Sequence, residues 1–277
     1  MFAAHMDSIG LVVTHIGDDG YVHVGPLGGV KPAEVLYTPV RFRNGARGVI
    51  CAELEADVSK LKPADLLIDL GAASKEEAEK LVQVGDAAVF ETPTARAGDR
   101  VISPYLDNRV GCLVLLLAME RIGQTDNDLY FLFTAQEEVG TRGAKTAAWT
   151  VDPDYGVAVD VTPTDDQPGA KHRVTAKCGG GAGVKVMDSM IICQPVMVEK
   201  LISLAAEKNI PAQRDVIRQG GTDGGPIHLT RGGVYTGGVT IPCRYGHSPA
   251  ALVDLNDVEA CAGLAAAFAE SKLEKEC

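Results

Sequence analysis

Beyond Val101 the chain alternates short apolar strands with helices, and this pattern restricts the folds that it can adopt. The expected strands fall at 129–135, 155–161 and 234–241, and the expected helices at 110–122, 142–149, 195–208 and 258–273. Such alternation is typical of a mostly parallel sheet with helices on both faces. We therefore expect an α/β domain, to which the apolar strand at residues 1–6 also belongs.

Residues 9 to about 97 have a different character. Short β-rich runs are separated there by Gly, Pro and Asp turn signals, which is typical of a small β-barrel or sandwich. One helix is expected to interrupt these strands, with Ser74 as its N-cap and its end at Val84. The sequence thus predicts an α/β domain of residues 1–8 and 98–277, split by an inserted β-rich domain of residues 9–97.

Composition excludes several classes of function. The net charge is −11, whereas nucleic acids and anionic membranes attract basic surfaces. No apolar run approaches the roughly 18 residues of a membrane span, and the amino end lacks a signal-peptide pattern. The seven cysteines never form a C-x-x-C pair, which favours reduced thiols. We expect a cytoplasmic protein that binds neither nucleic acid nor membrane.

Two adjacent carboxylates, Glu137 and Glu138, follow the apolar strand 129–135. The carboxyl ends of strands are where α/β folds place their chemistry. Neighbouring carboxylates repel one another unless a cation holds one of them, so a metal ligand beside a general base would explain the pair. Further candidates occur at strand ends or in the turns beyond them, namely His5, Asp7, Asp107, Asp160 and His247.

Each candidate also has a structural explanation. Asp107 can cap the helix that follows it, the two glutamates can form an exposed first helical turn, Asp160 can belong to a turn, and His247 can brace a proline turn. Taken together they supply two histidines, three acids and a separate base. That inventory suits a bridged pair of zinc, cobalt or manganese ions roughly 3.5–4 Å apart.

The strings around these residues resemble, in order and approximate spacing, the motifs of the glutamyl/leucyl aminopeptidases that form tetrahedral (TET-type) dodecamers. They are Ala4-His5-Met6-Asp7-Ser8-Ile9-Gly10, Leu106-Asp107-Asn108-Arg109-Val110-Gly111, Gln136-Glu137-Glu138-Val139-Gly140, Val159-Asp160-Val161-Thr162, Gly221-Thr222-Asp223 and Ile241-Pro242-Cys243-Arg244-Tyr245-Gly246-His247-Ser248-Pro249. The resemblance extends from residue 1 to about 265. It implies a zinc-exopeptidase-like α/β fold.

The resemblance also implies roles for single residues, with two divalent ions per subunit, zinc or cobalt before manganese. Asp107 is expected to bridge the ions. His5 and Asp160 complete one site, and Glu138 and His247 complete the other. Glu137 is expected to be the general base, and Asp7 to orient the His5 imidazole. The residues expected to line the pocket near the substrate amino end are Gly221, Thr222 and Asp223.

Residues 9–97 match the dimerisation domain of that family, so self-association into dimers and dodecamers is a further expectation. The family also has about sixty residues before the His5 strand, so we expect a longer reading frame upstream of Met1. Three explanations compete for the missing segment: a start codon placed too late, a fragment, or a genuinely short paralogue.

The predicted function is metal-dependent removal of amino-terminal residues from short peptides. Two alternatives stay open at this stage: a deacylase or carboxypeptidase on the same fold, and a catalytically impaired assembly paralogue. The sequence leaves the side-chain preference and the native metal open.

Overall fold

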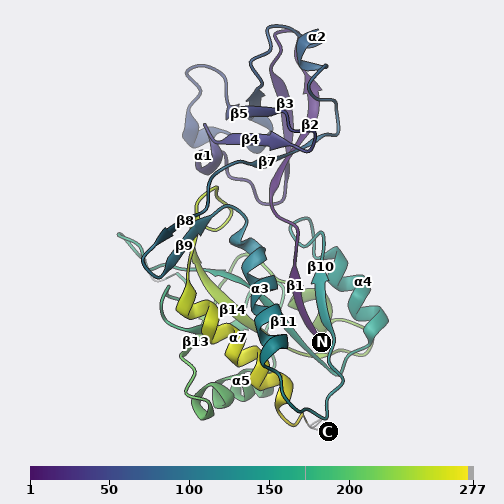
Figure 1. The fold of residues 1–277 in the computed structure, drawn as a ribbon, viewed down its shortest axis with the longest axis vertical. Helices are drawn as coiled ribbons and strands as arrows, with labels where there is room; N and C mark the ends of the chain where they lie inside the picture. The colour runs from purple at the N-terminus through teal and green to yellow at the C-terminus, as the bar shows by residue number, and fades with distance from the viewer. Residues whose placement is uncertain (172, 274–277) are drawn as a thin grey trace.

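The computed structural model describes residues 1–171 and 173–273, which form a small β-barrel and a larger α/β domain (Figure 1). Two connections join them, at residues 6–9 and 91–94. The α/β domain with an inserted barrel is therefore confirmed. The predicted domain limit at 277 lies outside the described residues.

The large sheet is mixed. Its main path runs through β10 (Phe131–Thr134), β1 (Phe2–His5), β11 (Tyr155–Pro163), β14 (Tyr235–Arg244), β15 (Ala251–Asp254), β9 (Arg100–Ser103) and β8 (Ala95–Ala97). The first four strands are parallel, and the remaining pairs on this path are antiparallel. Off the path, β12 (Ala182–Met187) lies antiparallel to β14 and parallel to β13 (Ala212–Val216). Four neighbouring strands are parallel, as the alternation predicted, but the sheet as a whole is less uniformly parallel than the sequence pattern indicated.

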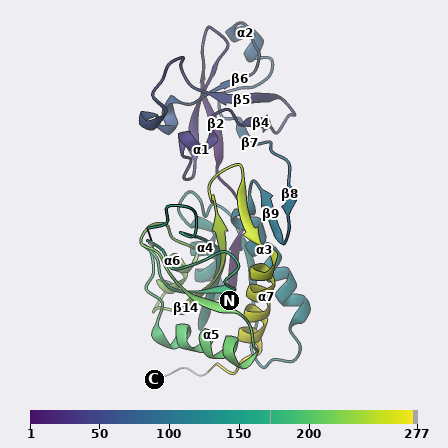
Figure 2. The same cartoon turned by 90° about the vertical axis from the view of Figure 1, so that its left-hand side faces the viewer.

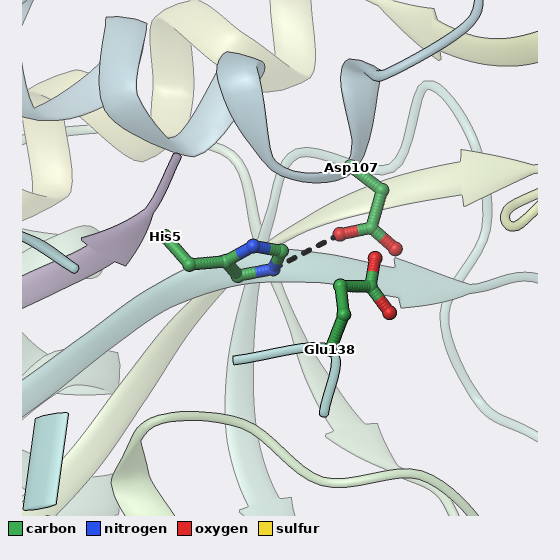
Figure 3. A group of neighbouring side chains, drawn as sticks. All are labelled: His5, Asp107 and Glu138. Atoms are coloured by element: carbon green, nitrogen blue, oxygen red, sulfur yellow. Dashed lines mark ion pairs between the residues drawn. The ribbon is translucent and has the colours of Figure 1, made fainter. Parts of the chain in front are cut away.

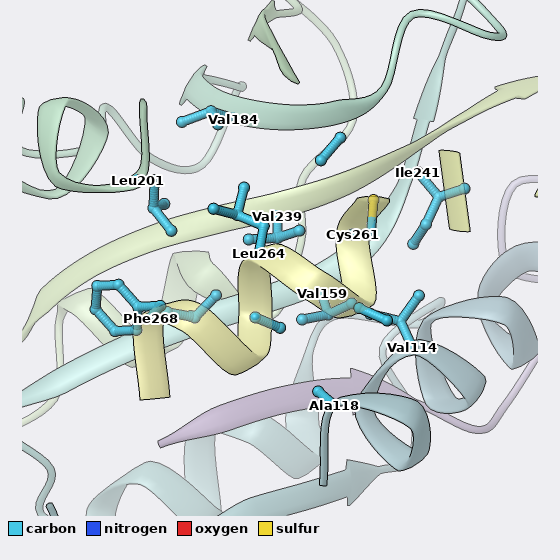
Figure 4. Close-up of a cluster of buried hydrophobic side chains, with 14 of the residues drawn as sticks. Val114, Ala118, Val159, Val184, Leu201, Val239, Ile241, Cys261, Leu264 and Phe268 are labelled. Carbon is cyan, nitrogen blue, oxygen red and sulfur yellow. The ribbon is translucent and has the colours of Figure 1, made fainter. Parts of the chain in front are cut away.

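Helices cover both faces of this sheet, as the alternation predicted (Figure 2). The first face carries α3 (Leu106–Arg121), α5 (Pro195–Glu207) and α7 (Leu255–Glu270), and the second carries α4 (Arg142–Val151) and α6 (Gly224–His228). The main core lies between the sheet and the first group, where Val114, Leu201, Val239, Leu264 and Phe268 pack together (Figure 4). Burial of these apolar side chains stabilises the packing of the helices on the sheet that carries the site.

The inserted domain is a closed barrel rather than a sandwich. Its strand order is β2 (Gly10–Ile16), β3 (Val22–Leu27), β6 (Leu67–Asp69), β5 (Arg47–Cys51), β4 (Pro39–Phe42) and β7 (Ala87–Phe90). The short helices α1 (Pro32–Val35), α2 (Lys75–Ala78), η1 (Val58–Lys60) and η2 (Pro63–Asp65) join these strands.

Two details of the barrel differ from the sequence expectation. Ser74 caps α2 by accepting a hydrogen bond from the Glu77 N–H, but the helix ends at Ala78 instead of Val84. The chain turns there toward β7, and Gly85 takes a left-handed conformation within the turn. The last barrel strand ends at Phe90, so β8, which the expected boundary at 97 placed in the insertion, belongs to the large sheet.

The parallel strands bring the candidate residues to one edge. His5 pairs with Thr134 of β10, and Ala3 pairs with Ala158 of β11, so Asp160 lies beside His5 at the carboxyl ends of both strands. This edge faces the barrel (Figure 1). Within residues 1–171 and 173–273, none of the helices combines the length and the hydropathy that a membrane span needs.

Candidate metal centre

Asp107 lies between two imidazoles. Its Oδ1 is 3.1 Å from His5 Nε2 and its Oδ2 is 3.2 Å from His247 Nε2. Figure 3 shows His5, Asp107 and Glu138 pointing toward one another from three separate segments. One carboxylate facing two histidines with different oxygens is the geometry that a bridging ligand requires.

The local backbone explains why Asp107 faces the site. Tyr105, in a left-handed conformation, occupies the N-cap position of α3, and Asp107 itself has φ −80° and ψ 106°. Asp107 therefore does not cap the helix. Asn108 anchors this turn by donating to the Val159 carbonyl at 2.8 Å and accepting from the Gly111 N–H at 3.0 Å. Asn108 was not among the candidates expected from the sequence, although it lies next to Asp107.

Glu137 and Glu138 lie in a turn between β10 and α4, and their side chains are only 11% and 5% exposed. An exposed first helical turn is thus excluded. Asp7 Oδ1 accepts the Glu137 N–H at 3.1 Å and its Oδ2 accepts the Glu138 N–H at 3.2 Å. The Asp7 carbonyl oxygen lies 3.1 Å from His5 Nδ1, closer than the carboxylate at 3.6 Å. Asp7 consequently holds the glutamate turn with its side chain and faces the imidazole chiefly with its backbone.

The remaining candidates complete the cluster. Asp160 is buried inside β11, and its Oδ1 is 3.5 Å from His5 Nε2. Glu137 Oε2 is 3.8 Å from the same nitrogen. Glu138 Oε2 is 3.3 Å from His247 Nε2. The six side chains that sequence analysis proposed as ligands or base therefore meet at one place.

Burial and the close approach of several carboxylates shift the pKa values in the cluster. Burial, reinforced by the charge of Asp160, raises the pKa of Glu137 to about 9. Burial and the charge of Asp107 raise the pKa of Glu138 to about 7. Burial alone would also raise the pKa of Asp107, but its bonds to the two histidines hold that pKa below its usual range. The hydrogen bond to Asp107 raises the pKa of His247 to about 9. Buried carboxylates with raised pKa values gain from a neighbouring cation, so this arrangement of acids and imidazoles suits a divalent metal.

A cleft of about 1070 Å³ opens over these residues. Gly221 and Thr222 are among the residues that line it. Asp223 is buried, and its Oδ2 accepts a hydrogen bond from the Thr134 hydroxyl at 2.5 Å. Met190 and Ile217 also line the cleft and were not expected there, whereas Tyr245 belongs to the quoted motif at 241–249 but had no assigned role. Met190 and Ile217 lie in loops without periodicity, so no signal in the sequence marked them.

The sequence profile of the M42 glutamyl aminopeptidases matches residues 1–264. The chain belongs to this family.

Known aminopeptidases are similar to this M42 family member in sequence and in structure. Aminopeptidase APDkam598 from the archaeon Desulfurococcus kamchatkensis is 44% identical, with a TM-score of 0.93 over 98% of this chain and 79% of that one. The lysyl aminopeptidase of Pyrococcus furiosus is 35% identical over 98% of this chain and 81% of its own length. The Pyrococcus horikoshii TET1 peptidase, which can assemble into a tetrahedron or a large octahedral shell, is 33% identical, with a TM-score of 0.84 over 97% and 82%. The resemblance of the motifs is confirmed, and the chain is an aminopeptidase.

The donor set of this aminopeptidase fits a divalent metal. His5, Asp107 and Glu138 each offer a ligand atom, and these atoms lie within 4.8 Å of one another. Glu138 Oε1 is buried without a hydrogen-bond partner. Among the described residues, the ion-pair partners of the four cluster carboxylates Asp107, Glu137, Glu138 and Asp160 are histidines, with neither lysine nor arginine among them. Oxygen and imidazole donors suit zinc, cobalt or manganese.

Proposed function

We propose that the protein is a dinuclear metal-dependent aminopeptidase that removes amino-terminal residues from short peptides. The observation that carries this proposal is the position of Asp107 between His5 and His247. Asp107 would bridge two ions, one completed by His5 and Asp160 and the other by Glu138 and His247. Zinc and cobalt suit these ligands best, and manganese is compatible with them.

The residues of the chain divide the chemistry between them. When bound, divalent ions supply Lewis-acid activation of the scissile carbonyl and of water. Glu137, at the edge of the cluster and in the cleft wall, takes the proton of the attacking water and delivers it to the leaving amine. The Asp7 carboxylate keeps the glutamate turn in place, because it accepts hydrogen bonds from the backbone N–H groups of Glu137 and Glu138. Gly221 and Thr222, in the wall of the cleft, would line the pocket for the amino end of a peptide.

Self-association and location complete the proposal. We infer dimers through the barrel and larger assemblies, which the P. horikoshii relative supports. The cysteines among the described residues are free, which supports a reducing compartment such as the cytoplasm.

The test compares Glu137→Gln with Asp107→Asn. Glu137→Gln should bind metal normally and lose about 10²–10⁴-fold in turnover, because it removes only the base. Asp107→Asn should lose metal as well. Metal content by mass spectrometry and hydrolysis of amino-acid p-nitroanilides measure both effects. Near-normal turnover of Glu137→Gln would refute the assignment of the base.

The same assay separates the alternatives. Hydrolysis of N-acyl amino acids in place of anilides would indicate a deacylase or carboxypeptidase. Two bound ions per chain without any turnover would indicate an impaired assembly paralogue.

A further inference from the structure

The barrel reaches the metal centre through two glycines. Gly28 and Gly29 lie in the connection between β3 and α1, and this connection is on the side of the barrel that faces the α/β domain (Figures 1 and 2). The Gly29 carbonyl oxygen lies 3.2 Å from His247 Nδ1. The inserted domain therefore contacts a residue of the cluster directly.

This contact fixes the tautomer of His247. A carbonyl oxygen only accepts hydrogen bonds, so Nδ1 must carry the proton. In the neutral ring the lone pair is then on Nε2, which lies 3.2 Å from Asp107 Oδ2 and 3.3 Å from Glu138 Oε2. A second hydrogen bond of this kind orients the ring of a ligating histidine and raises its basicity.

His247 needs this support more than His5 does. His5 is buried at the end of a central strand, whereas His247 lies in the loop between β14 and β15 with φ 61° and a side chain that is 34% exposed. A ring on a loop has more conformations to lose on ordering. The barrel turn restricts them.

Only glycine allows so close an approach. A Cβ on Gly29 would lie 2.7 Å from His247 Nδ1. A Cβ on Gly28, whose φ is +77°, would lie 3.1 Å from Glu138 Cβ and 3.2 Å from its Oε2. The glycine pair thus lets the barrel backbone touch both residues of one half of the centre.

We propose that the Gly28–Gly29 turn is a positioning element for the His247–Glu138 half of the centre, so that one of two metal ions binds only when the barrel is correctly seated. This inference rests on the proposed dinuclear function. It gives the barrel a role in metal binding in addition to the expected role in assembly.

The test is a titration of metal-stripped full-length protein with Co²⁺, followed by calorimetry and metal analysis. Wild type should bind two ions per chain. Gly29→Ala should keep one ion and bind the other about 10- to 100-fold more weakly, the usual effect of removing such a support. Gly25→Ala is the matched control, because it lies on β3 and its Cβ would meet only the side chains of Thr14 and Val12.

The outcomes are distinguishable. Two ions in wild type with an unchanged second affinity in Gly29→Ala overturn this inference alone. Fewer than two ions in wild type overturn the dinuclear function and this inference with it. His247→Ala and the double variant Gly29→Ala/His247→Ala should weaken the second ion equally, since both changes act through one ring; additive losses would count against the inference.

A second measurement needs no variant. In a crystal structure of the zinc-loaded wild type, His247 should bind the ion through Nε2 and donate from Nδ1 to Gly29. Coordination through Nδ1, or a Gly29 carbonyl directed away from the ring, would overturn the proposal even where Gly29→Ala fails to fold.

Discussion

Replacing Asp7 with asparagine should slow turnover without preventing folding. The two Asp7 carboxylate oxygens accept the N–H groups of Glu137 and Glu138 at 3.1 and 3.2 Å. Asparagine keeps one accepting oxygen, but its NH₂ group then faces the other N–H and cannot accept from it. The variant therefore loses one charge-assisted bond from the turn that carries the proposed base.

The size of the effect follows from that single bond. A hydrogen bond to a charged group contributes about 1.5–3 kcal/mol, and each 1.4 kcal/mol corresponds to a factor of ten in rate. If the bond is needed to hold Glu137 in its reactive position, kcat should fall by about 10- to 150-fold. KM should change little, since Asp7 does not line the cleft.

The assay is steady-state hydrolysis of amino-acid p-nitroanilides at saturating metal, with metal content measured in parallel. Asp19→Asn is the matched control, because Asp19 accepts a backbone N–H from Tyr21 at 3.2 Å on the barrel surface. It should leave kcat unchanged. A kcat of Asp7→Asn within twofold of wild type, with metal fully bound, would refute this reasoning.

Three further predictions concern the rest of the molecule. Lys185→Met should lower the free energy of unfolding, measured by urea titration, by about 3–5 kcal/mol, because it removes the cation 2.6 Å from the buried Asp215 carboxylate. The double variant Lys185→Met/Asp215→Leu should lose less stability, and an equal or greater loss would contradict this prediction. Gly111→Ala should cost about 1–3 kcal/mol, since the new methyl group would overlap Asn108 Oδ1, and metal affinity should fall with it. Burial raises the pKa of Glu138 to about 7, so metal binding should release protons and the apparent metal affinity should increase as the pH rises through that value. Calorimetry in buffers of different ionisation enthalpy measures this proton exchange, and proton uptake on metal binding would contradict the prediction.

Much of the site could be predicted because its residues lie at the ends of strands with clear apolar patterns. The run before Glu137 and the short strand before His5 identified two neighbouring parallel strands, and their carboxyl ends necessarily meet at one edge. Asp107 was recognisable in the same way, just before a long apolar helix.

The edges of the sheet could not be predicted so well. Strand β13 (Ala212–Val216) contains Asp215, which looks like a surface residue in the sequence but is buried against Lys185 of β12. Charged residues that neutralise one another inside a sheet hide the apolar pattern on which strand prediction depends. Sequence periodicity therefore missed both strands.

The contribution of the barrel was hidden for a different reason. Gly28 and Gly29 indicate a turn in the sequence, and nothing local reveals that this turn rests on His247, more than two hundred residues away. Contacts between domains depend on tertiary arrangement, which periodicity does not encode.

The most direct test of the account is metal content measured together with activity as Zn²⁺ or Co²⁺ is returned to the stripped protein. The account predicts two ions per chain, and p-nitroaniline release from amino-acid anilides that appears only as metal is restored. Hydrolysis that persists without metal, or saturation at one ion per chain, would contradict the central claim that Asp107 bridges two ions.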